Sequence, residues 1–197
     1  MRLDDVDICN QAIGLCGSTQ WIQSLTDQTT AARRCERFFQ SSVEKVLRKH
    51  DWHCASTNVS LAQNTDTPTV TYEYAYALPF DCVRLVEVYS SANGYSPYDR
   101  WEPQGRNIET DIDALYIRYV KMPEDYRELD ILLADAIAYE LAVMLAPTLV
   151  SNAEIYGILK QASQKALADA KAIDTLESKQ LYAENDVWED ARTSVGN

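Results

Sequence analysis

Hydrophobic residues recur at helical spacing in two blocks of the chain, which flank a middle stretch with strand-like alternation. In the first block, spacings of three and four over residues 3–16 and 28–50 are typical of amphipathic helices. Thr26-Asp27 provides an N-cap for the longer helix. The apolar positions are Val6, Cys9, Ile13 and Cys16 in the first helix and Ala31, Cys35, Phe38, Phe39, Val43, Val46 and Leu47 in the second. The pattern therefore predicts two N-terminal helices.

The period changes to two after Trp52, where Thr, Val and Tyr become frequent. Turn residues at Asn64, Pro79 and Asn93 divide this stretch. The predicted strands cover residues 54–62, 70–78, 83–90, 106–110 and 114–121. Residues 74–85 combine an aromatic strand, a Pro-Asp turn and a second strand, and they are the most informative segment of the sequence.

Helical spacing returns after Pro123, giving one helix that ends near Pro147 and a long one from about 151 to 181. The first has an apolar face formed by Leu129, Leu132, Leu133, Ala136, Ile137, Leu141, Met144 and Leu145. The predicted inner side of the second consists of Ala153, Tyr156, Leu159, Ala166, Ala170, Ile173 and Leu176. Alanine at these positions would let helices approach closely.

The order of these elements predicts an α+β fold. Residues 1–52 and 123–183 would form an α-helical bundle, and residues 53–122 an inserted antiparallel β domain. We expect residues 184–197 to be a flexible acidic C-terminal tail. The sequence has no apolar run that we expect to cross a bilayer, and the acidic residues near Met1 are unlike a signal peptide. These features predict synthesis in a reducing cytoplasm.

The formal net charge of -12 is unevenly distributed. Basic and acidic residues number seven and seven in residues 1–52, five and nine in 53–122, and six and fourteen in 123–197. Such an acidic surface disfavours tight binding to nucleic-acid phosphates. Solubility alone would also explain the charge.

Residue types that carry catalysis or bind metals are present, but not in a diagnostic arrangement. The five cysteines have no CxxC pair, so we expect reduced and mostly buried thiols. His50 and His53 could bind a metal with Asp51 or Cys54, yet a fourth ligand is not evident. Cys54 beside His53 lacks an orienting third group. We therefore predict no metal and no cofactor.

Carboxylates could in principle form a glycosidase-like pair. The candidates are Asp81, Glu87, Glu102 and Asp111. With 30 acidic residues in the chain, no one pair is distinguished by sequence. We therefore predict no catalytic residue and no enzymatic activity.

Aromatic residues in polar surroundings are better candidates for contact with partner proteins. The loop between residues 90 and 105 contains Tyr95, Tyr98 and Trp101. The acidic tail contains Trp188, flanked by Glu184, Asp186, Glu189 and Asp190. Either group could instead pack against the chain itself.

Several short motifs follow one another along nearly the whole chain. They are residues 9–17 and 24–27, Ala32 and Cys35, Leu47-Arg48 with Trp52 and Ala55, residues 78–84, 105–108 and 116–119, and Leu141-Ala142 with residues 145–148. In this order they resemble the tail tubular protein A family, the head-to-tail adaptors of short-tailed bacteriophages. The Leu-Pro-x-Asp-Cys-x-Arg unit at 78–84 is the most specific. The chain departs from the family at residues 50–55, where His-Pro-Trp-Asn-Phe-Ala is usual, although Trp52 is retained.

This resemblance implies a structural virion protein at the head–tail interface. Such adaptors form a ring, typically twelvefold, between the portal protein and the tail nozzle or tail tube. Duplex DNA passes through the ring during ejection without being bound tightly, and no membrane is involved. The resemblance makes the acidic tail, with Trp188, a candidate portal-docking segment.

Two other functions agree with the same sequence. A head-completion or stopper connector of a long-tailed phage would share the helical bundle but bind a tail-tube or terminator protein. A tail-associated cell-wall hydrolase would require a carboxylate pair in a concave pocket.

Overall fold

The computed structural model describes residues 2–65, 68, 71–92, 97–149 and 153–194, with side chains of the last helix described for residues 154–177. The chain divides into two compact units. The helical unit comprises residues 1–46, 52–54 and 125–197, and the β-rich unit comprises residues 47–51 and 55–124. The fold class is α+β, as predicted, with two small antiparallel sheets inserted between N-terminal and C-terminal helices.

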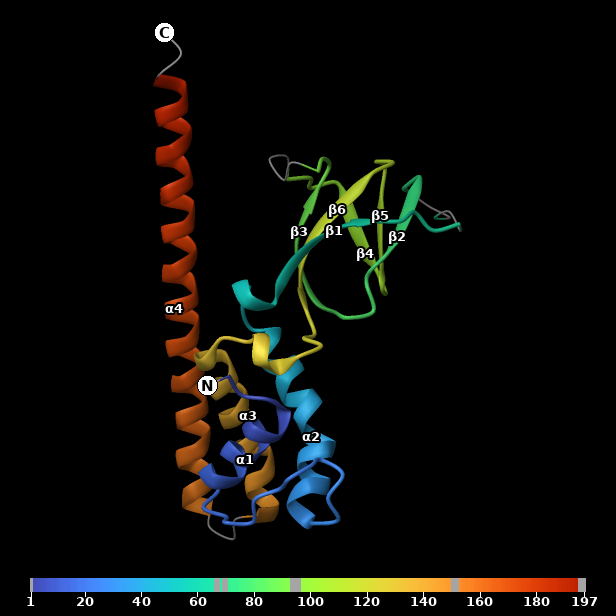
Figure 1. The fold of residues 1–197 in the computed structure, drawn as a ribbon. Coiled ribbons are helices and arrows are strands. Elements are labelled where there is room, and N and C mark those ends of the chain that lie inside the picture. The colour runs from blue at the N-terminus through green and yellow to red at the C-terminus, as the bar shows by residue number, and fades with distance from the viewer. Residues whose placement is uncertain (1, 66–67, 69–70, 93–96, 150–152, 195–197) are drawn as a thin grey trace. The chain divides into compact units, whose positions relative to one another are not determined.

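Within the described ranges, four long helices and two short 3-10 helices can be followed in Figure 1. They are α1 (Asp5–Leu15), α2 (Thr30–Leu47), η1 (His53–Ala55), η2 (Tyr126–Glu128), α3 (Ile131–Leu149) and α4 (Ala153–Ser194). Helix α3 packs against both α1 and α4. A side-chain hydrogen bond of 2.8 Å from Gln11 to Asp135 also connects α1 to α3. The first and last thirds of the sequence thus share one core.

Helix α1 begins at a capping box and ends at a left-handed glycine. The Asp4 carboxylate accepts a hydrogen bond from the Asp7 backbone N–H, and the Asp7 carboxylate accepts one from the Asp4 N–H. Gly17, with φ +76°, turns the chain after the helix. Gly14 lies within the helix, and a Cβ there would lie 3.0 Å from the Trp21 ring. Gly14 thus lets the Trp21 ring pack closely on α1.

Helix α2 starts later than its sequence suggested. The Thr29 hydroxyl, and not Asp27, accepts the hydrogen bond from the Ala32 N–H, so the predicted Thr26-Asp27 cap is wrong. Asp27 instead accepts bonds from the N–H groups of Gln23 and Ser24 in the preceding loop. Thr and Asp both favour helix caps and turns. Local geometry decides that Thr29 caps the helix and Asp27 stabilises the preceding loop.

Helix α3 is the most buried helix of the helical unit. Its buried residues are Leu133, Ala134, Ala136, Ile137, Ala138, Leu141, Ala142, Leu145 and Ala146. Among the described residues it is the one helix long and apolar enough to cross a membrane, so the expectation that the sequence holds no such run is wrong. Half of it is buried inside the structure, as in a core helix of a globular domain.

Helix α4 buries a narrower face than predicted and continues past the expected end near residue 181. Leu159, Ser163 and Ala170 are buried, and Ser163 donates to Glu140 of α3 at 3.4 Å. The predicted inner positions Tyr156, Ile173 and Leu176 are exposed, which corrects that assignment.

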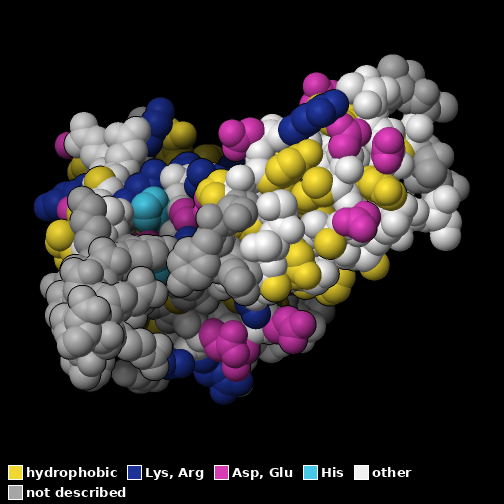
Figure 2. All heavy atoms as spheres, turned by 90° about the horizontal axis from the view of Figure 1, so that it is seen from above, with side chains coloured by type: hydrophobic (Ala, Val, Ile, Leu, Met, Phe, Trp, Pro, Cys, Tyr) yellow, Lys and Arg dark blue, Asp and Glu magenta, His cyan; other side chains and the backbone are white. Residues whose placement is uncertain are grey.

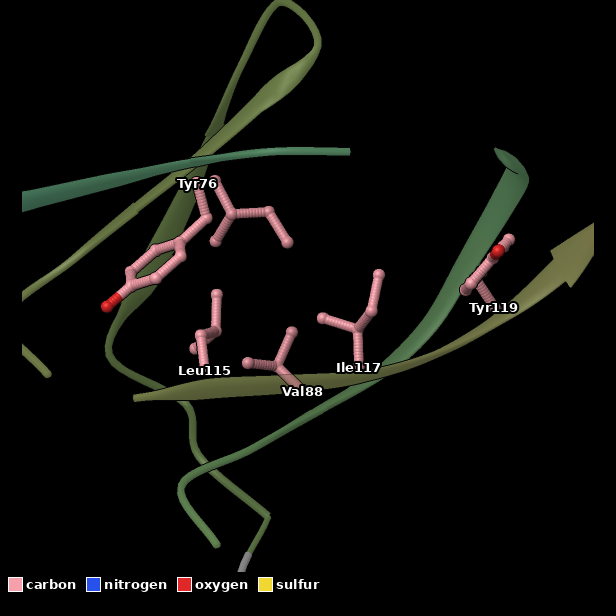
Figure 3. Packing of buried hydrophobic residues seen from close by; sticks show 6 residues of the cluster. Tyr76, Val88, Leu115, Ile117 and Tyr119 are labelled. Atoms are coloured by element: carbon pink, nitrogen blue, oxygen red, sulfur yellow. The ribbon is translucent and has the colours of Figure 1, made fainter. Parts of the chain in front are cut away.

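The β-rich unit contains two three-stranded antiparallel sheets. One has the order β1 (Ser56–Leu61), β6 (Leu115–Lys121), β3 (Cys82–Tyr89), and the other β2 (Tyr74–Ala77), β5 (Asn107–Thr110), β4 (Trp101–Gln104). Figure 3 shows Val88, Leu115 and Ile117 of the first sheet pointing toward Tyr76 of the second. With Ile108 and Tyr119 they form the buried core of this unit.

Strands β2 and β3 flank the Pro-Asp turn as predicted, but they belong to different sheets. The turn is closed by a 3.0 Å bond from the Cys82 N–H to the Pro79 carbonyl. It therefore carries the chain from one sheet to the other. Strand β4 was not predicted, because its Pro103 argues against a strand. Only an edge strand accommodates proline, and β4 pairs on one side with β5.

Candidate partner-binding surfaces

The predicted portal-docking residues belong to the C-terminal part of α4. The backbone of Glu184, Asp186, Trp188, Glu189 and Asp190 is helical. Their side chains lie outside the part of the chain for which side chains are described. The docking role of this segment therefore stays a prediction.

The aromatic loop between residues 90 and 105 divides into parts with different roles. Tyr95 lies outside the described residues. Tyr98 is half-buried, and its N–H donates to the Val88 carbonyl at 2.9 Å. Trp101 belongs to β4 and is partly buried against the β-rich core, so it lies on a strand and not in a loop, and its role in partner contact stays a prediction. Sequence reasoning missed this because the strand was not recognised.

An apolar row follows α4 beside its buried face. Ile158 and Leu176 are 59% and 58% exposed, and Ile173 is also exposed. Ala162 and Ala166 lie between them and are half-buried. The five residues recur at spacings of four, four, seven and three, which keeps them on one side of the helix and is the spacing by which one helix packs along another. We call these five residues the α4 row.

Two charged residues of opposite sign, Lys165 and Asp169, lie on the same side of α4 as the row, near its middle. Both are exposed. Polar or charged groups inside a helix-packing seam specify its register at a cost in stability. A helix packed along the α4 row would therefore meet apolar contacts at both ends and opposite charges at the centre.

Phe80 is the most exposed large hydrophobic residue that the structure describes, at 92%. It lies at the tip of the Pro79–Asp81 turn, which is fixed from both sides. The Arg106 guanidinium donates to the Pro79 carbonyl at 2.5 Å and lies 3.4 Å from that of Phe80. The Leu78 N–H donates in turn to the Arg106 carbonyl at 2.8 Å. The aromatic ring is therefore presented on an ordered support.

The helical unit contains a pocket of about 390 Å³. Its apolar lining comes from Leu3, Leu129, Ile131 and Ala134, and its acidic lining from Glu128, Asp130, Asp174 and Glu177. Arg2, His53 and Cys54 complete it. His53 is paired with Asp174, with 3.3 Å between Nδ1 and Oδ2. We call this the α3–α4 pocket.

Three of the four carboxylates considered for catalysis have structural contacts. Asp81 accepts a 3.2 Å bond from the Tyr119 hydroxyl, and Glu87 accepts one of 2.7 Å from Tyr89. Asp111 pairs with Arg100 at 2.9 Å. Burial, reinforced by the charge of Asp81, raises the pKa of Tyr119 to about 12. The contacts of Asp81, Glu87 and Asp111 thus have a structural role in the β-rich unit.

Candidate metal ligands also lie apart. Within the described ranges, no group of three or more His, Cys, Asp or Glu side chains could hold a metal ion. All five cysteines are free thiols, and Cys9, Cys16 and Cys35 are buried in the helical unit. A hydrogen bond to Cys35, together with burial, raises the pKa of the Cys9 thiol, and burial raises the pKa of Cys16 to about 11. High pKa values make these two thiols unreactive near neutral pH.

Figure 2 shows hydrophobic side chains interspersed with Asp and Glu on the β-rich unit. Protein-contact surfaces combine these residue types, whereas phosphate-binding surfaces need clustered Lys and Arg. This face of the β-rich unit is thus better suited to protein contact than to nucleic acid.

No model of a known protein family matches this chain, and the search of curated proteins finds no match either.

Proposed function

We propose that this chain is a head-to-tail adaptor of a short-tailed bacteriophage, a structural virion protein that forms a ring between the portal and the tail. Its channel would carry the genome during ejection. The ordered motifs, above all residues 78–84, support this proposal. The α+β architecture agrees with it, since N- and C-terminal helices form one unit around an inserted β-rich unit.

The observation that carries the proposal is the α4 row. A helix in a monomer needs one buried stripe, and α4 has that stripe at Leu159, Ala170 and the polar Ser163. The additional row, with its exposed Ile158, Ile173 and Leu176, is a surface for a further helix or a neighbouring subunit. Repetition of one such contact around an axis closes a ring when the rotation between copies permits it.

The charge distribution agrees with a DNA conduit. A channel that conducts DNA must not retain it, and phosphate contacts through Lys and Arg are the main source of nonspecific affinity. The net charge of -12 opposes such contacts. The basic residues of α2 would then give at most weak, salt-sensitive binding to duplex DNA.

The proposal is tested by mixing the purified chain with the portal protein encoded beside it. Native mass spectrometry and negative-stain electron microscopy should reveal a closed multimer of this chain bound to the portal ring. We expect the double variant Ile158→Glu/Leu176→Glu to keep its melting temperature and circular dichroism but lose the multimer, since both side chains are exposed in the monomer.

The matched control is Gln161→Glu/Gln164→Glu, which adds the same charge at exposed positions on other sides of α4. This control should assemble like the unchanged chain. Absence of any complex with the portal would contradict the adaptor proposal. Equal assembly by both double variants would show that the α4 row is not the subunit contact.

A further inference from the structure

The Phe80 turn combines an exposed aromatic ring with a local excess of positive charge. Arg48 donates to the Val83 carbonyl at 2.6 Å, and Arg106 donates to the turn itself. Lys121 is opposite Cys82 in the β3–β6 register, and Arg84 follows two residues later on β3. Among the residues that the structure describes, these four cations form no ion pair. We call these four residues, which lie on or bind the segments that flank the turn, the basic collar; Asp81, whose carboxylate accepts from the Tyr119 hydroxyl, is the acidic residue of the turn itself.

The α3–α4 pocket has the opposite character. Its apolar lining includes Ile131, which is 47% exposed, and Leu3. Four carboxylates and one arginine line it, besides His53, which is already paired with Asp174. Its volume of about 390 Å³ exceeds the roughly 150 Å³ at which an apolar cavity admits a benzene molecule. The pocket therefore has enough volume for an aromatic side chain.

We propose that Phe80 of one copy inserts into the α3–α4 pocket of a second copy, with the basic collar facing the pocket's carboxylates. We call Phe80 with its basic collar the knob. The contact is heterologous, because the knob and the pocket are different surfaces of the chain, and such contacts generate rings or open filaments. This inference deepens the adaptor proposal and rests on it for the closure of the ring. It adds a second subunit contact to the α4 row.

A second copy is the occupant that the charges favour. The knob is basic while the chain as a whole carries -12, so another copy supplies the acidic surface that the collar requires. Aromatic anchors that fill a pocket within a charged rim are the usual centres of binding energy at protein interfaces. The rigid support of Phe80 reduces the entropy lost on docking.

Single-stranded nucleic acid is the other ligand class with aromatic and cationic contacts. Such sites use a groove of cations with several stacking aromatics along the strand. Phe80 is a single ring, and Arg48 and Arg106 already donate to carbonyls of their own chain. The observations therefore favour a protein contact.

Photo-cross-linking tests the contact in the full chain. Phe80 is replaced by p-benzoyl-phenylalanine, which keeps an aromatic ring at the tip of the turn. This variant is mixed with isotope-labelled unchanged chain and irradiated, both alone and with the portal. We expect mass spectrometry to locate cross-links in labelled peptides containing residues 128–134 or 174–177. The same group at Trp21, another exposed aromatic residue, is the control and should not label these peptides.

Charge exchange provides a second readout. Arg84→Glu and Glu177→Arg should each lower the yield of the cross-link, by about tenfold, and their combination in opposite copies should restore it. Cross-links elsewhere, or equal yields from positions 80 and 21, would overturn the inference. So would tight binding of single-stranded DNA that is lost in Phe80→Ala.

The two proposals can fail separately. Rings on the portal whose position-80 cross-links fall outside the pocket would leave the adaptor function standing and refute the knob contact. Cross-links into the pocket without any portal complex would support the knob contact and contradict the adaptor function.

Discussion

Asp174 of α4 binds both the backbone and the side chain of His53. One carboxylate oxygen accepts the His53 N–H at 3.1 Å, and the other lies 3.3 Å from Nδ1 of its imidazole. His53 belongs to the segment 52–54, which is part of the helical unit although the residues before and after it belong to the β-rich unit. This contact therefore holds the connecting segment on the helical unit.

We predict that Asp174→Ala lowers the free energy of unfolding by about 1–2 kcal/mol, because it removes an acceptor from two polar groups. Asp174→Asn keeps one oxygen acceptor and should give an intermediate loss. Urea denaturation measures both. Asp169→Ala, at an exposed position on the same helix, should stay within about 0.5 kcal/mol of the unchanged chain. Equal stability of the 174 and 169 variants would contradict the structural role of this contact.

Trp52 anchors the same segment. It is 1% exposed, and its indole N–H donates to the Val46 carbonyl at 3.2 Å. We expect Trp52→Ala to cost about 3–5 kcal/mol, since it leaves a large cavity and an unsatisfied carbonyl. Trp52→Phe should cost less, and Trp21→Ala, at a 60% exposed position, less than about 1 kcal/mol. Thermal and urea unfolding measure the free energy of unfolding of the three variants. A similar loss of stability in all three would refute the predicted order.

Ionisation of Tyr119 makes the β-rich unit less stable as the pH rises in the alkaline range. Its pKa is raised from 10.0 to about 12 by burial and by Asp81, so the folded state holds this proton more tightly than the unfolded chain. The resulting stabilisation is complete below pH 10 and is lost as the pH rises from about 10 to 12. Tyr119→Phe cannot ionise, and its unfolding midpoint should fall less steeply over that range. If the urea midpoints of the two proteins fell equally with pH between 10 and 12, the raised pKa of Tyr119 would be contradicted.

The sequence predicts a role for Trp188 that can be tested without knowing its contacts. Trp188→Ala, and removal of residues 184–197, should weaken binding to portal-bearing heads while preserving the melting temperature. Burial of a tryptophan at an interface commonly contributes more than about 2 kcal/mol, so the dissociation constant should rise at least about 30-fold. Sedimentation of labelled chain with heads measures the change. Unchanged binding by both variants would place the portal contact elsewhere.

Helix and strand positions could be read from periodicity wherever one face is buried against a single layer. Cys9 and Ile13 in α1 and Val43 and Val46 in α2 lie in the core as their spacing predicted. The prediction failed for α4, where two apolar stripes overlap. Spacing alone could not tell buried Ala170 from exposed Ile173, because both lie on the apolar side of the helix.

Partner surfaces were less predictable than the core. Composition drew attention to Trp101, yet this residue is partly buried against the β-rich core, and the strand β4 that places it there was not predicted. Phe80 lay inside the most informative segment, but its exposure, and the hydrogen bond from the distant Arg106 to its turn, are visible only in the structure. The α3–α4 pocket combines Leu3, His53, Ile131 and Asp174, and only the tertiary fold brings these together.

The most direct test of the adaptor proposal is cryo-electron microscopy of the phage particle encoded together with this chain, reconstructed at the junction of head and tail. The proposal predicts a closed ring of this α+β fold between the portal and the tail, with DNA or an open channel on its axis. Absence of the chain from the particle, or its location at another site such as the tail tip, would contradict the proposal.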